Sequence, residues 1–283
     1  MTSIKKVGVL GSGIMGSGLA EVVARAGLDV VVRSRTQAGA DAVLAKVDSG
    51  LARHVAKERM TEEERQAILG RISVTDHLGQ LADCDLVIES VVEDLEVKRA
   101  LFAELEQIVK PEGILATNTS TLPVVELAMM TQRPSQVCGI HFFNPAPAMS
   151  LVEIIRPLTA SDETIATAAG FVEACGKNAV HVEDRAGFIV NALLFPYLNN
   201  AVRMLENGTA SMDDIDAAMM GGCNFPMGPF ALLDLVGLDT SVSILEALYA
   251  EFSDANYAAV PLLRRMVAAG HLGRKSKQGF RTY

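Results

Sequence analysis

The sequence predicts an α/β protein with a doubly wound parallel sheet in its N-terminal part and a smaller, all-helical C-terminal part. Short apolar runs alternate with segments of helical periodicity as far as Val182. A glycine-rich turn joins the first apolar run to the first helical segment, and from Gly187 onward the patterns are helical. Alternating strands and helices build parallel sheets, and their connections are almost always right-handed. We therefore expect two closely packed domains, residues 1–185 and residues 186–283.

The first predicted strand, Ile4 to Leu10, leads into a turn with the spacing G-x-G-x-x-G and then into a helix that ends at Gly27. The first glycine allows the tight turn, the second lets the backbone approach a pyrophosphate, and the third lets the helix pack on the strand. An ordinary βα turn that needs small residues is the alternative. Here the motif follows a strand, opens a helix and precedes a second strand, Val30 to Val32, which predicts a Rossmann-type dinucleotide site. Its cofactor-binding residues are Gly11, Ser12, Gly13, Ile14, Met15 and Gly16.

The remaining elements continue the alternation before the change to helices. Further strands are predicted at Ile72 to Thr75, Leu86 to Val92, Ile114 to Thr117, Gln136 to Phe142, Leu151 to Ile155 and Lys177 to Val182. Helices are predicted at Gln37 to Lys57, Asp94 to Val109, Gly187 to Glu206, Met212 to Met220, Leu232 to Phe252 and Pro261 to Ala269. Ligands of such sheets bind beyond the carboxyl ends of the strands, so the strand ends at Gly11, Glu93 and Ser120 should face one crevice.

Composition and charge narrow the class of protein. The 283 residues are 49% hydrophobic and carry a net charge of −9, which disfavours binding to nucleic acid or to an anionic membrane surface. No apolar run reaches the roughly 18 residues of a membrane span, and the first strand leaves no room for a signal peptide. The four cysteines are scattered without metal-binding spacing, as expected of free thiols in a reducing compartment. We therefore expect a cytoplasmic protein without a structural metal.

His141 and Glu153 are the most informative pair of titratable residues. They lie on consecutive predicted strands that flank a proline-rich turn, which indicates an antiparallel hairpin. If the hairpin folds symmetrically about Pro147, His141 faces Glu153 at the short distance of directly opposed side chains. A carboxylate beside an imidazole stabilises its charged form and fixes its tautomer, so that histidine can act as acid and base. A histidine on a buried strand is otherwise a core residue, but the strand end, the opposed acid and the nucleotide fold favour catalysis.

Other polar residues allow a functional and a structural interpretation. Ser120 follows a strand and could donate a hydrogen bond to a substrate, or it could cap a helix or form an ST-turn. Asn191 lies among apolar residues of a predicted helix and must find partners in a neighbouring backbone or a substrate. Arg53 and Lys57 are four residues apart on a predicted helix and share a face. They could bind phosphate, although such a group is usually a solvated helix face.

Blocks of sequence along nearly the whole chain carry a further signal. They are Gly11-Ser-Gly-Ile-Met-Gly-Ser-Gly18, Val87-Ile-Glu-Ser-Val-Val-Glu93, Thr117-Asn-Thr-Ser120, His141-Phe-Phe-Asn-Pro145, Leu151-Val-Glu153, Gly187-Phe-Ile-Val-Asn191, Pro226-Met-Gly-Pro229 and Asp234-Leu-Val-Gly-Leu-Asp239. With these blocks in this order, the chain resembles the short, monofunctional 3-hydroxyacyl-CoA dehydrogenases, and most of all the bacterial 3-hydroxybutyryl-CoA dehydrogenases. The resemblance implies an oxidoreductase that transfers a hydride between a nicotinamide cofactor and the 3-position of a short-chain 3-hydroxyacyl-CoA or 3-oxoacyl-CoA, such as 3-hydroxybutyryl-CoA and acetoacetyl-CoA.

The same resemblance implies catalytic roles for four residues. His141 would be the acid and base, and Glu153 would orient it. Ser120 and Asn191 would hold the reacting oxygen and the thioester region of the substrate. These roles agree with the interpretation of the residue types and spacing above.

The resemblance also implies how the larger ligands bind. Glu93, Lys98 and Asn118 would lie around the nicotinamide half of the cofactor, and Arg53 and Lys57 would bind the phosphates of CoA. Family members are typically dimers through the helical C-terminal domain, so a homodimer is expected here.

The chain departs from the family at the end of its second strand, where an aspartate usually binds the adenosine ribose. Here that position is Ser34, flanked by Arg33 and Arg35. An acid would repel the 2′-phosphate of NADP, and Ser34 removes this repulsion. Alternation along the strand lets only one arginine reach the phosphate, so we predict that NADP(H) is preferred over NAD(H). If both arginines are solvated, the enzyme is instead indifferent between the two cofactors.

Two other functions remain open from the sequence alone. One is a related dehydrogenase that acts on a 3-hydroxyacyl group bound to an acyl carrier protein, or on a free hydroxy acid. The other is a non-catalytic cofactor-binding protein, because fold does not imply function. The sequence leaves the preferred acyl length, the pathway and the physiological direction undetermined.

Overall fold

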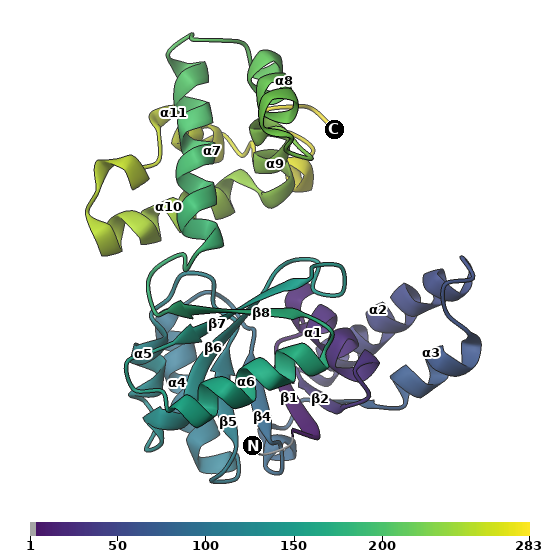
Figure 1. The fold of residues 1–283 in the computed structure, drawn as a ribbon. Coiled ribbons are helices and arrows are strands. Elements are labelled where there is room, and N and C mark those ends of the chain that lie inside the picture. The colour runs from purple at the N-terminus through teal and green to yellow at the C-terminus, as the bar shows by residue number, and fades with distance from the viewer. Residues whose placement is uncertain (1–3) are drawn as a thin grey trace. The chain divides into compact units, whose positions relative to one another are not determined.

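The computed structural model describes residues 4–283, and the chain divides into two compact units. The first unit ends at Asp184 and the second begins at Arg185, one residue before the boundary expected from the sequence. The first unit contains a sheet with helices, and the second is helical (Figure 1). The predicted fold class is confirmed.

The first unit is built on a single eight-stranded sheet with the order β3-β2-β1-β4-β5-β6-β7-β8. All neighbouring strands are parallel except β6 and β7, which are antiparallel. The strands are β1 (Lys6–Leu10), β2 (Asp29–Arg33), β3 (Ile72–Thr75), β4 (Leu86–Glu89), β5 (Ile114–Thr117), β6 (Val137–Phe142), β7 (Leu151–Arg156) and β8 (Asn178–Glu183). The strand order reverses between β1 and β4, which is where doubly wound sheets bind dinucleotides.

Helices cover both faces of this sheet. α1 (Ile14–Arg25), α2 (Gln37–Val55) and α6 (Asp162–Ala174) share one apolar core with the strands. α4 (Leu95–Ile108) and α5 (Val124–Ala128) lie on the opposite side, behind the sheet in Figure 1. The central strands β4 and β5 are buried along their whole length, as expected of a parallel sheet covered on both faces.

α2 and α3 (Glu62–Leu69) form a helical hairpin that projects from the edge of the sheet (Figure 1). The Thr61 side chain and the Glu64 side chain cap the start of α3 reciprocally. Short 3₁₀ segments in the first unit are η1 (Leu78–Leu81) and η2 (Pro134–Gln136).

The second unit packs its helices around a core of its own. They are α7 (Val190–Glu206), α8 (Met212–Cys223), α9 (Pro229–Val236), α10 (Leu238–Phe252) and α11 (Pro261–Ala268), with the 3₁₀ segments η3 (Ala255–Tyr257) and η4 (Arg274–Ser276). The buried Asp234 joins this core to the end of the chain, because it accepts hydrogen bonds from the backbone N–H of Phe280 (2.8 Å) and Arg281 (2.9 Å) and from the Tyr283 hydroxyl (3.1 Å). Asp216 likewise accepts from the Phe230 N–H and from the Arg281 guanidinium.

Several element boundaries differ from the prediction. The single helix expected over Leu232 to Phe252 is two helices, because Gly237 has a φ of 104° that a helix cannot accommodate. α7 begins three residues later than expected, since Gly187 and Phe188 have positive φ angles. β4 ends at Glu89 rather than at Val92, because the Glu89 carboxylate accepts the Val91 N–H and turns the chain. The helices α5 and α6 were not predicted.

Candidate functional site

The glycine turn between β1 and α1 has the geometry that its spacing predicted. Gly11 has a φ of 120°, and a Cβ there would lie 2.2 Å from the Ser90 carbonyl oxygen. A Cβ on Gly16 would lie 1.9 Å from the Gly11 carbonyl oxygen, so the third glycine permits close packing of helix on strand. Gly13 has no atom within 4 Å of its Cβ position, which leaves space for a ligand against the backbone.

The start of α1 fits a pyrophosphate. Gly13 is the N-cap and supplies no side-chain hydrogen bond, and no acidic residue lies in the first turn. The first N–H groups of a helix have no intrahelical partner and carry partial positive charge, so an uncapped start is an anion site. Ile14 begins this helix with a largely exposed side chain, and Met15 is partly buried against the core of the unit.

The end of β2 contacts the glycine turn. Ser34 is buried and donates a hydrogen bond to the hydroxyl of Ser12 at 3.0 Å. Arg33 donates from Nε to the backbone carbonyl of Asp76 at 3.3 Å. Arg35 is exposed, and within residues 4–283 its side chain makes no ion pair. The two arginines differ in their surroundings because β2 ends at Arg33 and Arg35 lies beyond it. Alternation was the wrong reason to expect this difference, since positions i and i+2 of a strand share a face.

Three charged side chains meet at the carboxyl ends of β4 and β5. The Lys98 ammonium, on α4, lies 2.8 and 2.9 Å from the two oxygens of Glu89 and 3.1 Å from Glu93 Oε2. Glu89 also accepts the Thr117 hydroxyl at 2.8 Å. Lys98 and Glu89 are almost completely buried, whereas Glu93 is partly exposed. A lysine buried in this way is stabilised only because its charge is paired and fully hydrogen-bonded.

Glu93 holds the loop that follows β5. Its Oε1 accepts hydrogen bonds from the Thr119 hydroxyl (2.6 Å), the Ser120 N–H (2.9 Å) and the Ser120 hydroxyl (3.2 Å). Burial alone would raise the pKa of Glu93, but the Lys98 charge and these hydrogen bonds outweigh it and lower the pKa. Glu93 is therefore a carboxylate that orders the loop, and Ser120 is one of its donors. Asn118, in the same loop, accepts the Phe142 N–H at 2.8 Å and so ties β5 to β6.

His141 and Glu153 face each other across the β6–β7 hairpin, as predicted. His141 Nδ1 lies 2.8 Å from Glu153 Oε2, and both side chains are buried. A carboxylate accepts hydrogen bonds, so it favours the tautomer in which Nδ1 carries the proton and Nε2 carries the basic lone pair. The Phe143 ring lies 4.5 Å from the imidazole, centroid to centroid. The pair can therefore act as a proton-transfer unit at Nε2.

Lys177 stabilises the turn of this hairpin through hydrogen bonds. Its ammonium donates to the backbone carbonyls of Ala146 (2.9 Å), Pro147 (3.0 Å) and Met149 (2.8 Å). Burial lowers the pKa of Lys177, because these carbonyls replace water around the charge. The same turn packs on α1, since a Cβ on Gly18 would lie 3.1 Å from the Ala146 Cβ. Lys177 therefore stabilises the hairpin turn that packs on the helix of the glycine turn.

The remaining predicted residues belong to other elements. Asn191 is a buried residue at the start of α7 in the second unit. Arg53 is exposed near the end of α2, and within residues 4–283 neither it nor Lys57 makes an ion pair. The prediction that these two share a helix face is wrong, because α2 ends at Val55 and Lys57 lies in the turn that follows.

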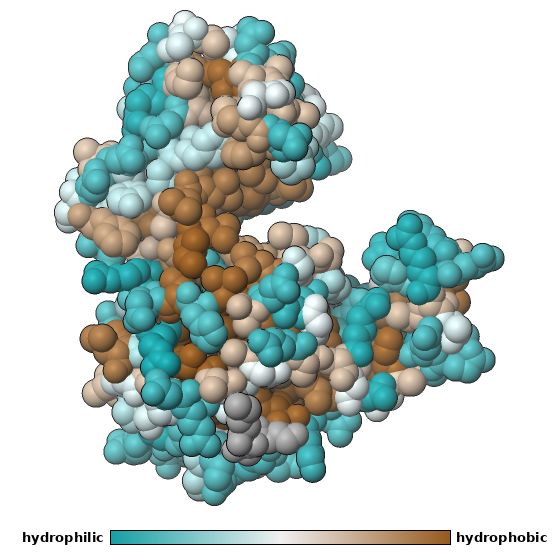
Figure 2. Space-filling view, in the orientation of Figure 1, coloured by the Kyte–Doolittle hydropathy of each residue, from teal (hydrophilic) through white to brown (hydrophobic). Residues whose placement is uncertain are grey.

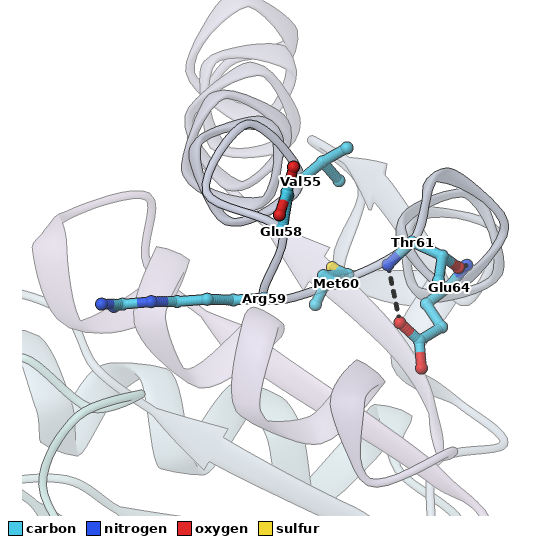
Figure 3. Close-up of a pocket in the computed structure, with 6 residues that line it drawn as sticks. All are labelled: Val55, Glu58, Arg59, Met60, Thr61 and Glu64. Atoms are coloured by element: carbon cyan, nitrogen blue, oxygen red, sulfur yellow. Dashed lines mark hydrogen bonds between the residues drawn. The ribbon is translucent and has the colours of Figure 1, made fainter.

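The tip of the α2–α3 hairpin contains an open pocket of about 410 Å³. Figure 3 shows the residues that line it: Val55, Glu58, Arg59, Met60, Thr61 and Glu64. Two of them are carboxylates, and the Arg59 side chain extends away from Thr61 and Glu64 in this view. The hairpin tip is hydrophilic on its surface (Figure 2). Neither Arg53 nor Lys57 lines the pocket, so it lends no support to their expected phosphate role.

Sequence reasoning missed Glu89 and Lys177 as parts of the site. A detectable signal existed for Glu89, because a carboxylate that ends an otherwise apolar strand must be paired when buried. Lys177 gave no such signal, since its partners are backbone carbonyls distant in sequence. Within the described residues no cluster of histidine, cysteine or carboxylate side chains could hold a metal. None of the helices formed by residues 4–283 has the length and apolarity needed to cross a membrane.

Comparisons with known proteins match both units of the chain. The family model described as "3-hydroxyacyl-CoA dehydrogenase, NAD binding domain" matches residues 6–185, and "3-hydroxyacyl-CoA dehydrogenase, C-terminal domain" matches residues 187–283. The chain is 46% identical over 283 residues to a 3-hydroxybutyryl-CoA dehydrogenase of Mycobacterium tuberculosis, with 99% of each chain covered. It is 45% identical over 278 residues to the 3-hydroxybutyryl-CoA dehydrogenase of Clostridioides difficile, covering 98% of this chain and 99% of that one. The crystal structure of (S)-3-hydroxybutyryl-CoA dehydrogenase PaaH1 from Ralstonia eutropha superposes with a TM-score of 0.97 at 41% identity and 99% coverage of both chains.

Proposed function

The chain belongs to the 3-hydroxyacyl-CoA dehydrogenase family, and we propose that it interconverts a short-chain (S)-3-hydroxyacyl-CoA and the corresponding 3-oxoacyl-CoA. The pair 3-hydroxybutyryl-CoA and acetoacetyl-CoA is the proposed substrate and product. The observation that carries the proposal is the buried His141–Glu153 pair, at 2.8 Å, on the β6–β7 hairpin of the sheet that contains the dinucleotide-type β1–α1–β2 unit. The full-length similarity to 3-hydroxybutyryl-CoA dehydrogenases supports the choice of a four-carbon acyl group.

His141 performs the proton transfer in the proposed mechanism. In oxidation, its Nε2 takes the proton of the 3-hydroxyl group, and Glu153 stabilises the imidazolium that results. When bound, the nicotinamide cofactor supplies the acceptor for the hydride of C3. Ser120 and Asn191 hold the reacting oxygen and the thioester region. In reduction, His141 returns the proton to the carbonyl oxygen.

One assay separates this function from its competitors. Purified protein is supplied with NADPH or NADH and with acetoacetyl-CoA, acetoacetyl groups on a carrier protein, or free acetoacetate. We expect cofactor oxidation with acetoacetyl-CoA at a kcat/KM well above that of the other two substrates. A higher kcat/KM with the carrier-bound or the free acid would identify that compound, and not the CoA ester, as the substrate. No cofactor oxidation with any of the three would indicate a binding protein.

We also propose that NADP(H) is preferred over NAD(H). The support is the absence of an acid at Ser34 and the exposed position of Arg35, which is able to meet a 2′-phosphate. The Ser34 hydroxyl already donates to Ser12, so we assign the proposed contact with the 2′-phosphate to the arginines.

The Ser34→Asp variant tests this preference. It should move the ratio of kcat/KM values toward NADH by at least about tenfold, because the new carboxylate accepts from the ribose 2′-hydroxyl and repels the phosphate. A wild-type enzyme that prefers NADH would mean that another group supplies the ribose contact.

The remaining assignments are proposals of the same kind. The first domain, residues 1–185, binds the cofactor, with Glu93, Lys98 and Asn118 toward its nicotinamide half. The second, residues 186–283, contributes Asn191 and the contact of a homodimer. Four free cysteines support a reducing, cytoplasmic location.

A further inference from the structure

Glu89 is a buried carboxylate with every acceptor position used. Its Oε1 accepts from Lys98 (2.8 Å) and from the Val91 N–H (2.6 Å). Its Oε2 accepts from Lys98 (2.9 Å) and from the Thr117 hydroxyl (2.8 Å). Thr117 accepts the Thr119 N–H in turn, which directs its own proton to Glu89. Four hydrogen bonds from three donor groups occupy both oxygens and leave no place for a carboxyl proton, so Glu89 acts as a carboxylate.

The cluster to which Glu89 belongs therefore carries a net negative charge. Lys98 contributes one positive charge, and Glu89 and Glu93 each contribute one negative charge. Glu93 is ionised because its Oε1 accepts from Thr119 and Ser120 while its Oε2 faces Lys98. Burial shields this charge from solvent, so its field extends further than that of an exposed ion pair.

The cluster lies where its electrostatic field acts on the nicotinamide half of a bound cofactor. The glycine turn after β1 takes the pyrophosphate, and the end of β2 lies on the adenosine side, so the nicotinamide half falls on the side of β4 and β5. Glu89 is the last residue of β4, and Thr117 is the last residue of β5. An oxidised nicotinamide ring is positively charged and a reduced one is neutral. A negative cluster at these strand ends stabilises the oxidised form selectively.

We propose that Glu89 is a specificity-determining residue for the redox state of the cofactor, because it gives the Glu89–Lys98–Glu93 cluster its net negative charge. The inference rests on the proposed function only in that the ligand is a nicotinamide dinucleotide. Glu89 is fully buried behind Lys98, so it sets the charge without being available for direct contact from solvent. Glu93 and Lys98 alone would form a neutral pair.

The variant Glu89→Gln isolates this effect. The amide oxygen can keep one contact to Lys98 and the contact to the Val91 N–H. The amide nitrogen cannot accept, so the second Lys98 contact is lost and the nitrogen donates to the Thr117 hydroxyl instead. Dissociation constants for NADP⁺, NADPH, NAD⁺ and NADH are measured by calorimetry without substrate. The ratio of the oxidised to the reduced dissociation constant should rise by about three- to tenfold, because one negative charge is lost near the ring.

Asp85→Asn is the matched control. Asp85 precedes the opposite, amino end of β4 and pairs with Lys110, so the variant loses the same charge from a partly exposed carboxylate–lysine pair. Its ratio should equal that of the wild type. A Glu89→Gln protein that weakens both redox forms equally would overturn the proposal, since a purely structural role has that result.

A double variant keeps the test decisive if Glu89→Gln alone does not fold. Glu89→Gln with Lys98→Met removes both buried charges and leaves Glu93, so the net charge of the cluster returns to its wild-type value. Both dissociation constants should rise, because Lys98 is itself a proposed cofactor contact, but their ratio should return to that of the wild type. Removing a buried pair together is also less destabilising than leaving one charge unpaired. If the ratio of the oxidised to the reduced dissociation constant stays above the wild-type value in this double variant, the charge of Glu89 does not set the ratio. Because no substrate is present, failure of the dehydrogenase assay does not affect these outcomes.

Discussion

At the scale of single residues, the His141–Glu153 pair gives the sharpest expectation for activity. His141→Asn or Glu153→Gln should lower kcat by at least about 10², because general acid–base catalysis contributes about 10² to 10⁴. Cofactor affinity should change little, since the pair lies on the β6–β7 hairpin and is not among the residues proposed to bind the cofactor. Steady-state kinetics with acetoacetyl-CoA measure both quantities.

His181→Asn is the matched control for this pair. His181 is an exposed histidine of β8 in the same sheet, and its replacement should leave kcat unchanged. Near-normal turnover of both His141→Asn and Glu153→Gln would remove the pair from the mechanism.

The sequence was sufficient to predict the opposition of His141 and Glu153, because hairpin register follows from the position of the turn. It was not sufficient to predict the charge cluster. Lys98 was expected beside the cofactor, but its partner Glu89 lies nine residues away on another element, and only the packing of α4 on β4 brings them together. Side-chain pairs between elements depend on tertiary geometry that no local pattern contains.

At the scale of elements, the α2–α3 hairpin is where we expect the CoA nucleotide to bind. Arg53→Ala combined with Lys57→Ala should raise KM for acetoacetyl-CoA several-fold with little change in kcat, because a remote phosphate contact serves ground and transition state alike. The variant should also lose the wild-type preference for acetoacetyl-CoA over acetoacetyl-pantetheine.

Lys5→Ala combined with Arg265→Ala removes the same charge from exposed sites outside the hairpin and should leave KM unchanged. If the wild-type enzyme has the same KM for the CoA ester and the pantetheine ester, the hairpin does not bind the nucleotide.

Element boundaries were harder to predict than element types. The apolar period runs through Gly237 without interruption, so a single helix was expected where α9 and α10 meet. The break depends on a left-handed glycine, which periodicity does not report. α5 is short, and the Asp184 carboxylate stabilises it by accepting the N–H groups of Val124 and Val125. A stabilising contact so distant in sequence has no local signature.

At the scale of the whole molecule, we expect a dimer formed mainly through residues 186–283. Large apolar side chains are exposed on several helices of the second unit, among them Met220 and Leu235. Leu233, by contrast, lies in the core of its own unit. Light scattering at micromolar concentration should give twice the chain mass of 30.1 kDa.

Met220→Asp combined with Leu235→Asp should shift the mass toward that of a single chain, because a buried unpaired charge destabilises an apolar contact. Leu158→Asp changes a highly exposed leucine of the first unit and should leave the mass unchanged. A wild-type monomer would refute the expected assembly.

The contacts of Asp234 have a practical consequence for protein engineering. The final residues of the chain supply its donors, Phe280, Arg281 and Tyr283. A truncated chain that ends before these residues would leave the buried Asp234 carboxylate without hydrogen-bond donors. A fusion partner or affinity tag attached directly to Tyr283 would interfere sterically with the ring whose hydroxyl donates to Asp234. Any tag, fluorescent reporter or surface tether at this end therefore needs a flexible spacer that is long enough to preserve the hydrogen bonds of these residues to Asp234.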